Sequence, residues 1–261
     1  MNPAGSPPES GRIVAVINHK GGAGKTTTTV NLGAALASLG VKTLLADLDP
    51  QAHLTYSLGF MAHDLPETLA GCLRGTHTPA RVLLTRGEMG ILPSGLALSA
   101  VERELALKPD SERTLARVLS GISGFAVILI DCPPNLGALT VNALTAAHAV
   151  LMPAQPEFLA LQSLGMLKRT VEVVRQRLNP GLADQHIVFT RFQRNRRLHR
   201  EALATARKHY GPEVLESLIK DNIALAEAPS HGLDIFSYRP GSSGARDYLC
   251  LARELRKRMG L

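Results

Sequence analysis

Hydrophobic residues along this chain are concentrated in short continuous runs that alternate with longer amphipathic stretches. The run over residues 13–17, IVAVI, is rich in β-branched side chains and is typical of a strand buried on both faces. Similar runs predict strands at 43–46 and 125–130, with weaker ones at 150–152 and 187–190. Helical spacing predicts helices at 26–39, 96–107, 111–120, 138–148, 159–178, 197–209 and 245–259, whereas the region 55–110 is less regular.

This alternation of strands and helices favours an α/β fold, with a doubly wound, mostly parallel sheet flanked by helices. No internal repeat and no clear linker interrupts the pattern, so we expect a single domain over residues 12–261. Residues 1–11 lack the cationic and then apolar plan of a signal peptide, and we interpret them as a flexible tail.

The amino-acid composition argues against several classes of protein. Apolar residues make up 45% of the 261, enough for a full core, and no apolar run reaches the length of about 18 residues that a membrane span needs. The three cysteines are unevenly spaced without a C-x-x-C pair, which argues against a disulfide framework or zinc site and favours a reducing cytosol. The net charge of +7 indicates a polyanionic partner only if the basic residues are clustered.

The segment NHKGGAGKTTTT, residues 18–29, lies between the first predicted strand and the first predicted helix. It departs from the pattern G-x-x-x-x-G-K-[ST] of a phosphate-binding loop, because His19 replaces the first glycine and an extra lysine, Lys20, follows. Glycines let backbone N–H groups close around phosphate oxygens, and the helix N-terminus adds its positive end. We therefore expect the nucleotide to be bound by Gly21, Gly22, Ala23, Gly24, Lys25, Thr26 and Thr27.

Within this loop each polar side chain has an expected task. Lys25 can neutralise the β- and γ-phosphates of ATP, Thr26 can ligate Mg²⁺, and Thr27 can reach the α-phosphate.

Carboxylates follow two of the predicted strands. The segment LLADLDPQ ends one strand with Asp47 and Asp49, and ILIDCPPN ends another with Asp131. The carboxyl ends of parallel strands form the sheet edge where ligands bind. One of these side chains can hold Mg²⁺ through water and another can orient the attacking water.

Four segments together resemble the ParA/Soj partitioning ATPases, a family of the deviant Walker A group that also contains MinD and the nitrogenase iron protein. They are KGGAGKTT (20–27), DLDPQ (47–51), DCPPN (131–135) and NIALAEAPSHG (222–232), and they occur in this order over nearly the whole chain.

The resemblance implies roles for the remaining residues. Lys20 corresponds to the signature lysine, which reaches across a homodimer interface to the partner's ATP phosphates, so Lys20, Lys25 and Asp49 are the expected catalytic residues. Asp49 is expected to position water and Asp131 to hold a water of Mg²⁺. Asp47 has a supporting role beside the metal, Asn222 is expected to bind the nucleotide, and the segment around Pro229 is expected to border the adenine.

A basic segment, TRFQRNRRLHR at 190–200, is a candidate surface for DNA, since clustered guanidinium groups suit phosphate backbones without reading sequence. The resemblance implies nonspecific binding of nucleoid DNA by the ATP dimer, and hydrolysis stimulated by a ParB-type partner. The chain departs from the family where relatives have IPRN and NVRL, because it has IKDN and NIAL, so an arginine associated with DNA is replaced by Ala224. The expected DNA contacts are Arg191, Arg194, Arg196, Arg197, Arg200 and Lys220.

Two other functions are compatible with the same nucleotide site. A MinD-like ATPase would bind the membrane surface, for which residues 245–261 are amphipathic, although the same pattern describes a closing helix packed on the sheet. A metabolic phosphotransferase or ligase would need residues for a second substrate, and the scattered histidines suggest none. We expect a protein of the cytoplasm and nucleoid, without stable membrane association.

Overall fold

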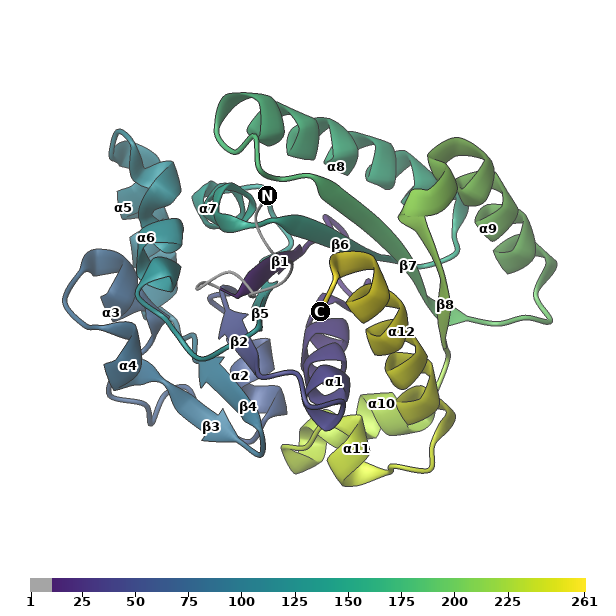
Figure 1. Cartoon of the computed structure of the whole chain (residues 1–261), viewed down its shortest axis with the longest axis horizontal. Coiled ribbons are helices and arrows are strands. Elements are labelled where there is room, and N and C mark those ends of the chain that lie inside the picture. The colour runs from purple at the N-terminus through teal and green to yellow at the C-terminus, as the bar shows by residue number, and fades with distance from the viewer. Residues whose placement is uncertain (1–10) are drawn as a thin grey trace, which may run out of the picture.

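The structure, a computed structural model, describes residues 11–261 except for the side chains of residues 158–161. The tail predicted for residues 1–11 therefore lies, apart from Gly11, outside the described residues. The strands of the described chain form one sheet in the order β3-β4-β2-β5-β1-β6-β7-β8 (Figure 1). Neighbouring strands are parallel except β3 and β4, which confirms the predicted mostly parallel sheet.

The strands are β1 (Arg12–Val16), β2 (Thr43–Asp47), β3 (Leu84–Arg86), β4 (Met89–Leu92), β5 (Val127–Asp131), β6 (Ala149–Ala154), β7 (Asp184–Phe192) and β8 (Val214–Lys220). The helices are α1 (Lys25–Ser38), α2 (His53–Ser57), α3 (Leu69–Arg74), α4 (Pro79–Val82), α5 (Ala97–Leu107), α6 (Thr114–Ser120), α7 (Ala138–Ala146), α8 (Phe158–Arg177), α9 (Arg197–Tyr210), α10 (Ile223–Glu227), α11 (Ile235–Tyr238) and α12 (Ser243–Met259). Short 3₁₀ turns occur at Ser111–Arg113, Gly211–Glu213 and Ala228–His231.

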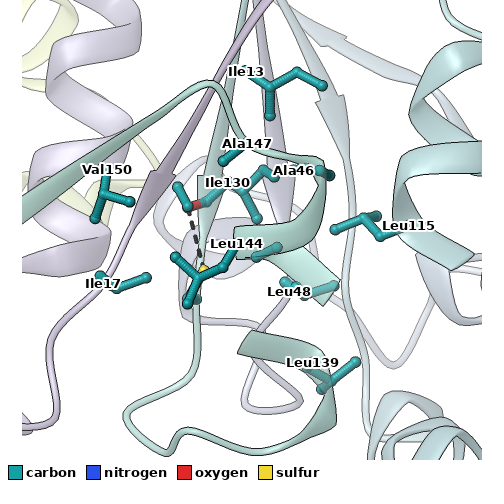
Figure 2. Packing of buried hydrophobic residues seen from close by; sticks show 14 of the residues in the cluster. Ile13, Ile17, Ala46, Leu48, Leu115, Ile130, Leu139, Leu144, Ala147 and Val150 are labelled. Atoms are coloured by element: carbon teal, nitrogen blue, oxygen red, sulfur yellow. Dashed lines mark hydrogen bonds between the residues drawn. The ribbon is translucent and has the colours of Figure 1, made fainter. Parts of the chain in front are cut away.

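Successive residues of each strand point to opposite faces of the sheet, and both faces are covered. Val14 and Val16 belong to a core with the buried side chains of α1 and α12, while Ile13 and Ala15 belong to a second core with those of α7. Figure 2 shows this second core, in which Ile130 and Val150 of the sheet approach Leu144 of α7. Burial on both sides explains why the central strands have continuous apolar sequences rather than alternating ones.

The predicted elements and the observed ones differ mainly at their ends. The helix predicted over 138–148 ends at Ala146, because His148 already pairs with the sheet: its backbone N–H donates to Ile13 O at 2.8 Å. The strand predicted at 125–130 begins at Val127. Strands β3, β4 and β8 and the short helices α2, α3, α4, α10 and α11 have no counterpart among the predicted elements, since they are too brief or too mixed in polarity to show a period.

The amphipathic C-terminal segment forms α12, which packs on the sheet beside α1 (Figure 1). Its apolar residues Tyr248, Leu251 and Leu255 are at most 1% exposed. The apolar face of α12 is therefore already used in the core. Among the described residues, no helix combines the length and the apolar character that crossing a membrane requires.

One buried polar side chain of β7 makes folding sensitive to acid. Neither ring nitrogen of His186 has a hydrogen-bond partner, and burial lowers the pKa of this histidine from its usual 6.5. Arg12 and Arg258 reinforce the shift, while Asp184 and Glu254 oppose it. Because the folded state disfavours the protonated ring, this contribution to stability is complete above the usual pKa and decreases as the pH falls below it.

We expect the free energy of unfolding of His186→Leu to exceed that of the wild type by roughly 1 kcal/mol at about pH 5, since the variant has no buried ring to protonate. Urea unfolding at acidic and neutral pH measures this difference. His209→Leu, at an exposed position of α9, is the control and should keep the wild-type pH dependence. A steeper decrease of stability with acid in His186→Leu would contradict the interpretation.

Candidate functional site

The candidate site lies where three strands end at the same level. Asp131, the last residue of β5, is in register with Val16 at the end of β1 and with Asp47 at the end of β2. The loop that follows β1 and the two carboxyl groups therefore meet at one edge of the sheet. This edge is the carboxyl end of a doubly wound sheet, where ligands bind in such folds.

The loop between β1 and α1 has the backbone conformation of a phosphate cradle. Gly22 and Gly24 have φ angles of 75° and 90°, a region that side chains rarely tolerate, and α1 begins directly afterwards at Lys25. A Cβ atom added at Gly21 or Gly22 would meet nothing within 4 Å, so the loop has open space in front of it. Its backbone N–H groups and the helix N-terminus suit an anion such as a nucleotide phosphate.

Side chains from distant strands hold this loop in place. Gln155 Nε2 donates to Gly22 O at 2.8 Å, and Thr190 Oγ1 donates to Ala23 O at 2.9 Å. These anchors come from the ends of β6 and β7 and are more than 130 residues away in sequence, so the sequence pattern did not reveal them. They make the loop a preformed feature of the fold.

Lys25 is a buried cation that fits a phosphate ligand. Lys25 is only 8% exposed, and no carboxylate of the described residues lies within 4.0 Å of its ammonium group. Burying an unpaired charge is costly, and a triphosphate would supply the missing negative charge.

Two of the three residues predicted to serve the metal, Thr26 and Asp131, are hydrogen-bonded to each other. Thr26 Oγ1 donates to Asp131 Oδ2 at 2.7 Å. Burial, reinforced by the charge of Asp47, raises the pKa of Asp131 to about 8. Among the described residues, no three His, Cys, Asp or Glu side chains are grouped as a metal site. Mg²⁺ bound here would therefore take most of its ligands from phosphate and water oxygens, as Mg²⁺ prefers.

Asp47 and Asp49 have different surroundings although they are two residues apart. Asp47 Oδ2 accepts from both the N–H and the hydroxyl of Thr55, at 2.9 and 2.7 Å, and burial raises its pKa to about 7. Asp49 Oδ1 accepts from Gln51 N at 2.9 Å, and Asp49 O accepts from Ser94 Oγ at 2.6 Å. Asp47 thus ties the end of β2 to α2, while Asp49 is held in the turn between them.

Lys20 is exposed, unlike the buried Lys25 of the same loop. Its ammonium group is 2.5 Å from Glu157 Oε2, and both side chains are about half exposed, at 45% and 47%. No local pattern in the sequence marks either Gln155 or Glu157, so sequence reasoning missed both residues.

The two residues outside the loop that are predicted to bind the nucleotide, Asn222 and Pro229, lie just before and just after α10. Asn222 caps α10, accepting from Ala224 N at 2.9 Å, and it lines an open pocket of about 640 Å³. Pro229 lies in the 3₁₀ turn Ala228–His231, which packs on α2, and does not line this pocket. The pocket is lined by Phe192, Gln193, Arg194, Asn195, Lys220, Asp221, Asn222 and Ile223, so it contains two residues predicted to contact DNA.

The arginines predicted to bind DNA are all exposed at the end of β7 and the start of α9. Arg191 lies 3.8 Å from Asp221, Arg197 pairs with Glu201, and Lys220 pairs with Asp247. Arg194, Arg196 and Arg200 have no carboxylate of the described residues within 4.0 Å. The uncompensated positive charge is therefore centred on residues 194–200.

Known proteins resemble this chain over nearly its whole length. A protein-family profile described as an AAA domain matches residues 11–184. The chromosome partitioning protein ParA of Caulobacter vibrioides is 40% identical over 249 residues, which cover 94% of this chain and 93% of that protein. The sporulation initiation inhibitor protein Soj of Bacillus subtilis is 38% identical over 248 residues, covering 94% and 98%.

A solved structure described as cobyrinic acid a,c-diamide synthase from Mycobacterium smegmatis, with bound ATP analog and magnesium, has a TM-score of 0.84 to this chain. It is 36% identical and covers 96% of this chain and 97% of its own.

We expect Asp131→Asn to keep the fold but to reduce the Mg²⁺-dependent part of ATP affinity by about tenfold, because the amide cannot carry the charge that stabilises the metal's water. Titration calorimetry with ATP, with and without Mg²⁺, measures this part separately. Without Mg²⁺ the variant should bind ATP about as well as the wild type, since burial raises the pKa of Asp131 and already disfavours its charged form when no metal is bound. An equal reduction in both conditions would contradict the metal role.

Proposed function

This chain belongs to the ParA/Soj family of chromosome-partitioning ATPases, and we propose that it acts as an ATP-dependent dimeric switch for DNA segregation. In this proposal two subunits enclose two Mg-ATP molecules, the dimer binds DNA without sequence preference, and hydrolysis releases it. The observation that carries the proposal is the position of Lys20, whose side chain is half exposed and pairs with Glu157 beside an open phosphate loop.

The chain's own residues divide the work of hydrolysis. Lys25 neutralises phosphate charge in its own subunit, and Lys20 completes the site of the partner subunit, as an arginine finger does in other ATPases. Asp49, held in its turn by Gln51 and Ser94, orients the attacking water. When bound, Mg-ATP would supply the phosphate bond that is cleaved and a divalent cation that offsets phosphate charge.

DNA binding is assigned to the exposed arginines at the end of β7 and the start of α9. Three of them have no carboxylate partner among the described residues, so their guanidinium groups are available to phosphates without first breaking an ion pair. In this proposal the basic surface at residues 194–200 compensates for the family arginine that Ala224 replaces. A ParB-type protein that stimulates hydrolysis is the partner that the family membership favours.

The core position of α12 favours DNA over the membrane surface as the target. A MinD-like function would need an apolar face to insert into lipid, whereas that of α12 is buried against the sheet.

The cysteine next to Asp131 gives no support to a ligase that uses a thiol. Cys132 is fully buried beside Asp131, and burial raises the pKa of its thiol well above the usual range.

We expect Asp49→Ala to bind ATP, to form a persistent dimer and to lower ATP turnover by about a hundredfold or more, since the water is no longer oriented. Size-exclusion chromatography with light scattering, in Mg-ATP and in Mg-ADP, measures the dimer. Adding Lys20→Ala to this variant should return it to a monomer. A monomeric Asp49→Ala at saturating ATP would count against the sandwich dimer.

We expect replacement of Arg194, Arg196 and Arg197 by alanine to weaken binding of duplex DNA by the ATP dimer. The slope of log affinity against log salt concentration should decrease by roughly 0.9 for each DNA phosphate that the variant no longer neutralises. Replacement of Arg103, Arg113 and Arg117, exposed on α5 and near α6 at the other end of the sheet, removes the same charge and is the matched control. Equal salt slopes in both variants would exclude this surface.

A further inference from the structure

The ion pair between Lys20 and Glu157 joins two parts of the site that are 137 residues apart in sequence. Lys20 lies in the phosphate loop, and Glu157 lies between the end of β6 and the first turn of α8. The two charged atoms are 2.5 Å apart within one subunit.

Hydrogen bonds connect the two segments that carry this ion pair. Lys20 N donates to Asn18 Oδ1 at 2.9 Å, and Asn18 Nδ2 donates to Pro153 O at 2.5 Å, which fastens the loop to β6. Two residues before Glu157, Gln155 donates to Gly22 O. The segment 153–157 therefore contacts the loop at three points, and only the contact at Lys20 is between charged side chains.

We propose that Glu157 is a positioning residue that holds Lys20 in its own subunit until the dimer forms. This inference rests on the proposed action of Lys20 across the dimer interface. One ammonium group cannot pair with Glu157 and enter the partner's triphosphate site at the same time, so closing the dimer must break two such ion pairs, one in each subunit.

The exposure of the ion pair decides the size of its effect. Exposed ion pairs typically contribute about 0.2 to 1 kcal/mol, so this one biases the equilibrium against the dimer and does not block it. Lys20 gains more in the partner's site, where two subunits exclude water and charge interactions strengthen.

Glu157 is not left without stabilisation when Lys20 leaves. It precedes the 20-residue helix α8, whose N-terminus favours negative charge. The exchange therefore leaves a half-exposed carboxylate at a helix N-terminus, which keeps its cost small.

The test is the dimer dissociation constant of Glu157→Gln, measured by analytical ultracentrifugation in saturating Mg-ATP with Asp49→Ala as the common background. Removal of two ion pairs should tighten the dimer by about 2-fold to 25-fold. At about 1 M salt the difference from the background variant should shrink, because exposed charges are screened. Glu157→Asp, which keeps the charge, should remain closer to the background variant than Glu157→Gln.

Glu172→Gln on the same helix is the matched control, because it removes an equally exposed ion pair, with Arg175, and should leave the dimer unchanged. An unchanged or weaker dimer in Glu157→Gln would overturn the proposal while leaving the proposed function intact. If the Asp49→Ala background itself stays monomeric in ATP, the proposed function fails instead.

A second measurement needs no dimer. In the nucleotide-free protein, an amine-acetylating reagent followed by mass spectrometry reports the reactivity of each lysine. We expect Lys20 to be acetylated faster in Glu157→Gln than in the wild type, with exposed Lys42 unchanged as internal reference. Equal rates at Lys20 would show that Glu157 does not hold it.

Discussion

The alignment of the ends of β1, β2 and β5 is the constraint on which the whole site depends. Because Asp131 is in register with both Val16 and Asp47, the phosphate loop and two carboxyl groups lie at one level of the sheet edge. A register shift of one residue in β5 would turn Asp131 to the other face and replace it with an apolar neighbour. The chemistry of the site thus relies on hydrogen bonding in the centre of the sheet.

This alignment concentrates opposing charges in a small buried volume. Asp47 and Asp131 are fully buried, which raises the pKa of both, while Lys25 is buried without a carboxylate partner among the described residues. The anchors Gln155 and Thr190 fix the loop around these groups before any ligand arrives. A site with this mixture of charges is suited to a ligand that brings both phosphate and a divalent cation.

The same loop extends from the buried site to the surface. Lys20 is next to the phosphate cradle yet half exposed, and its contact with Glu157 links the loop to β6 and α8. In the basic segment, Arg191 pairs with Asp221 and the neighbouring Lys220 pairs with Asp247, whereas Arg194, Arg196 and Arg200 have no carboxylate partner among the described residues. In the proposed function, the surfaces for a second subunit and for DNA are therefore exposed parts of the chain around the buried carboxylates.

The sequence by itself determined the fold class, the phosphate loop, the carboxylates after two strands and the basic segment, because each depends on local patterns or on residues close together in the chain. Only the tertiary structure decided that Asp47 binds Thr55 and that Glu157 pairs with Lys20. Strands β3, β4 and β8 likewise became visible only in the sheet. The physical reason is that these features arise from pairings between segments far apart along the chain, and neither hydrophobic period nor motif spacing carries information about which segments meet.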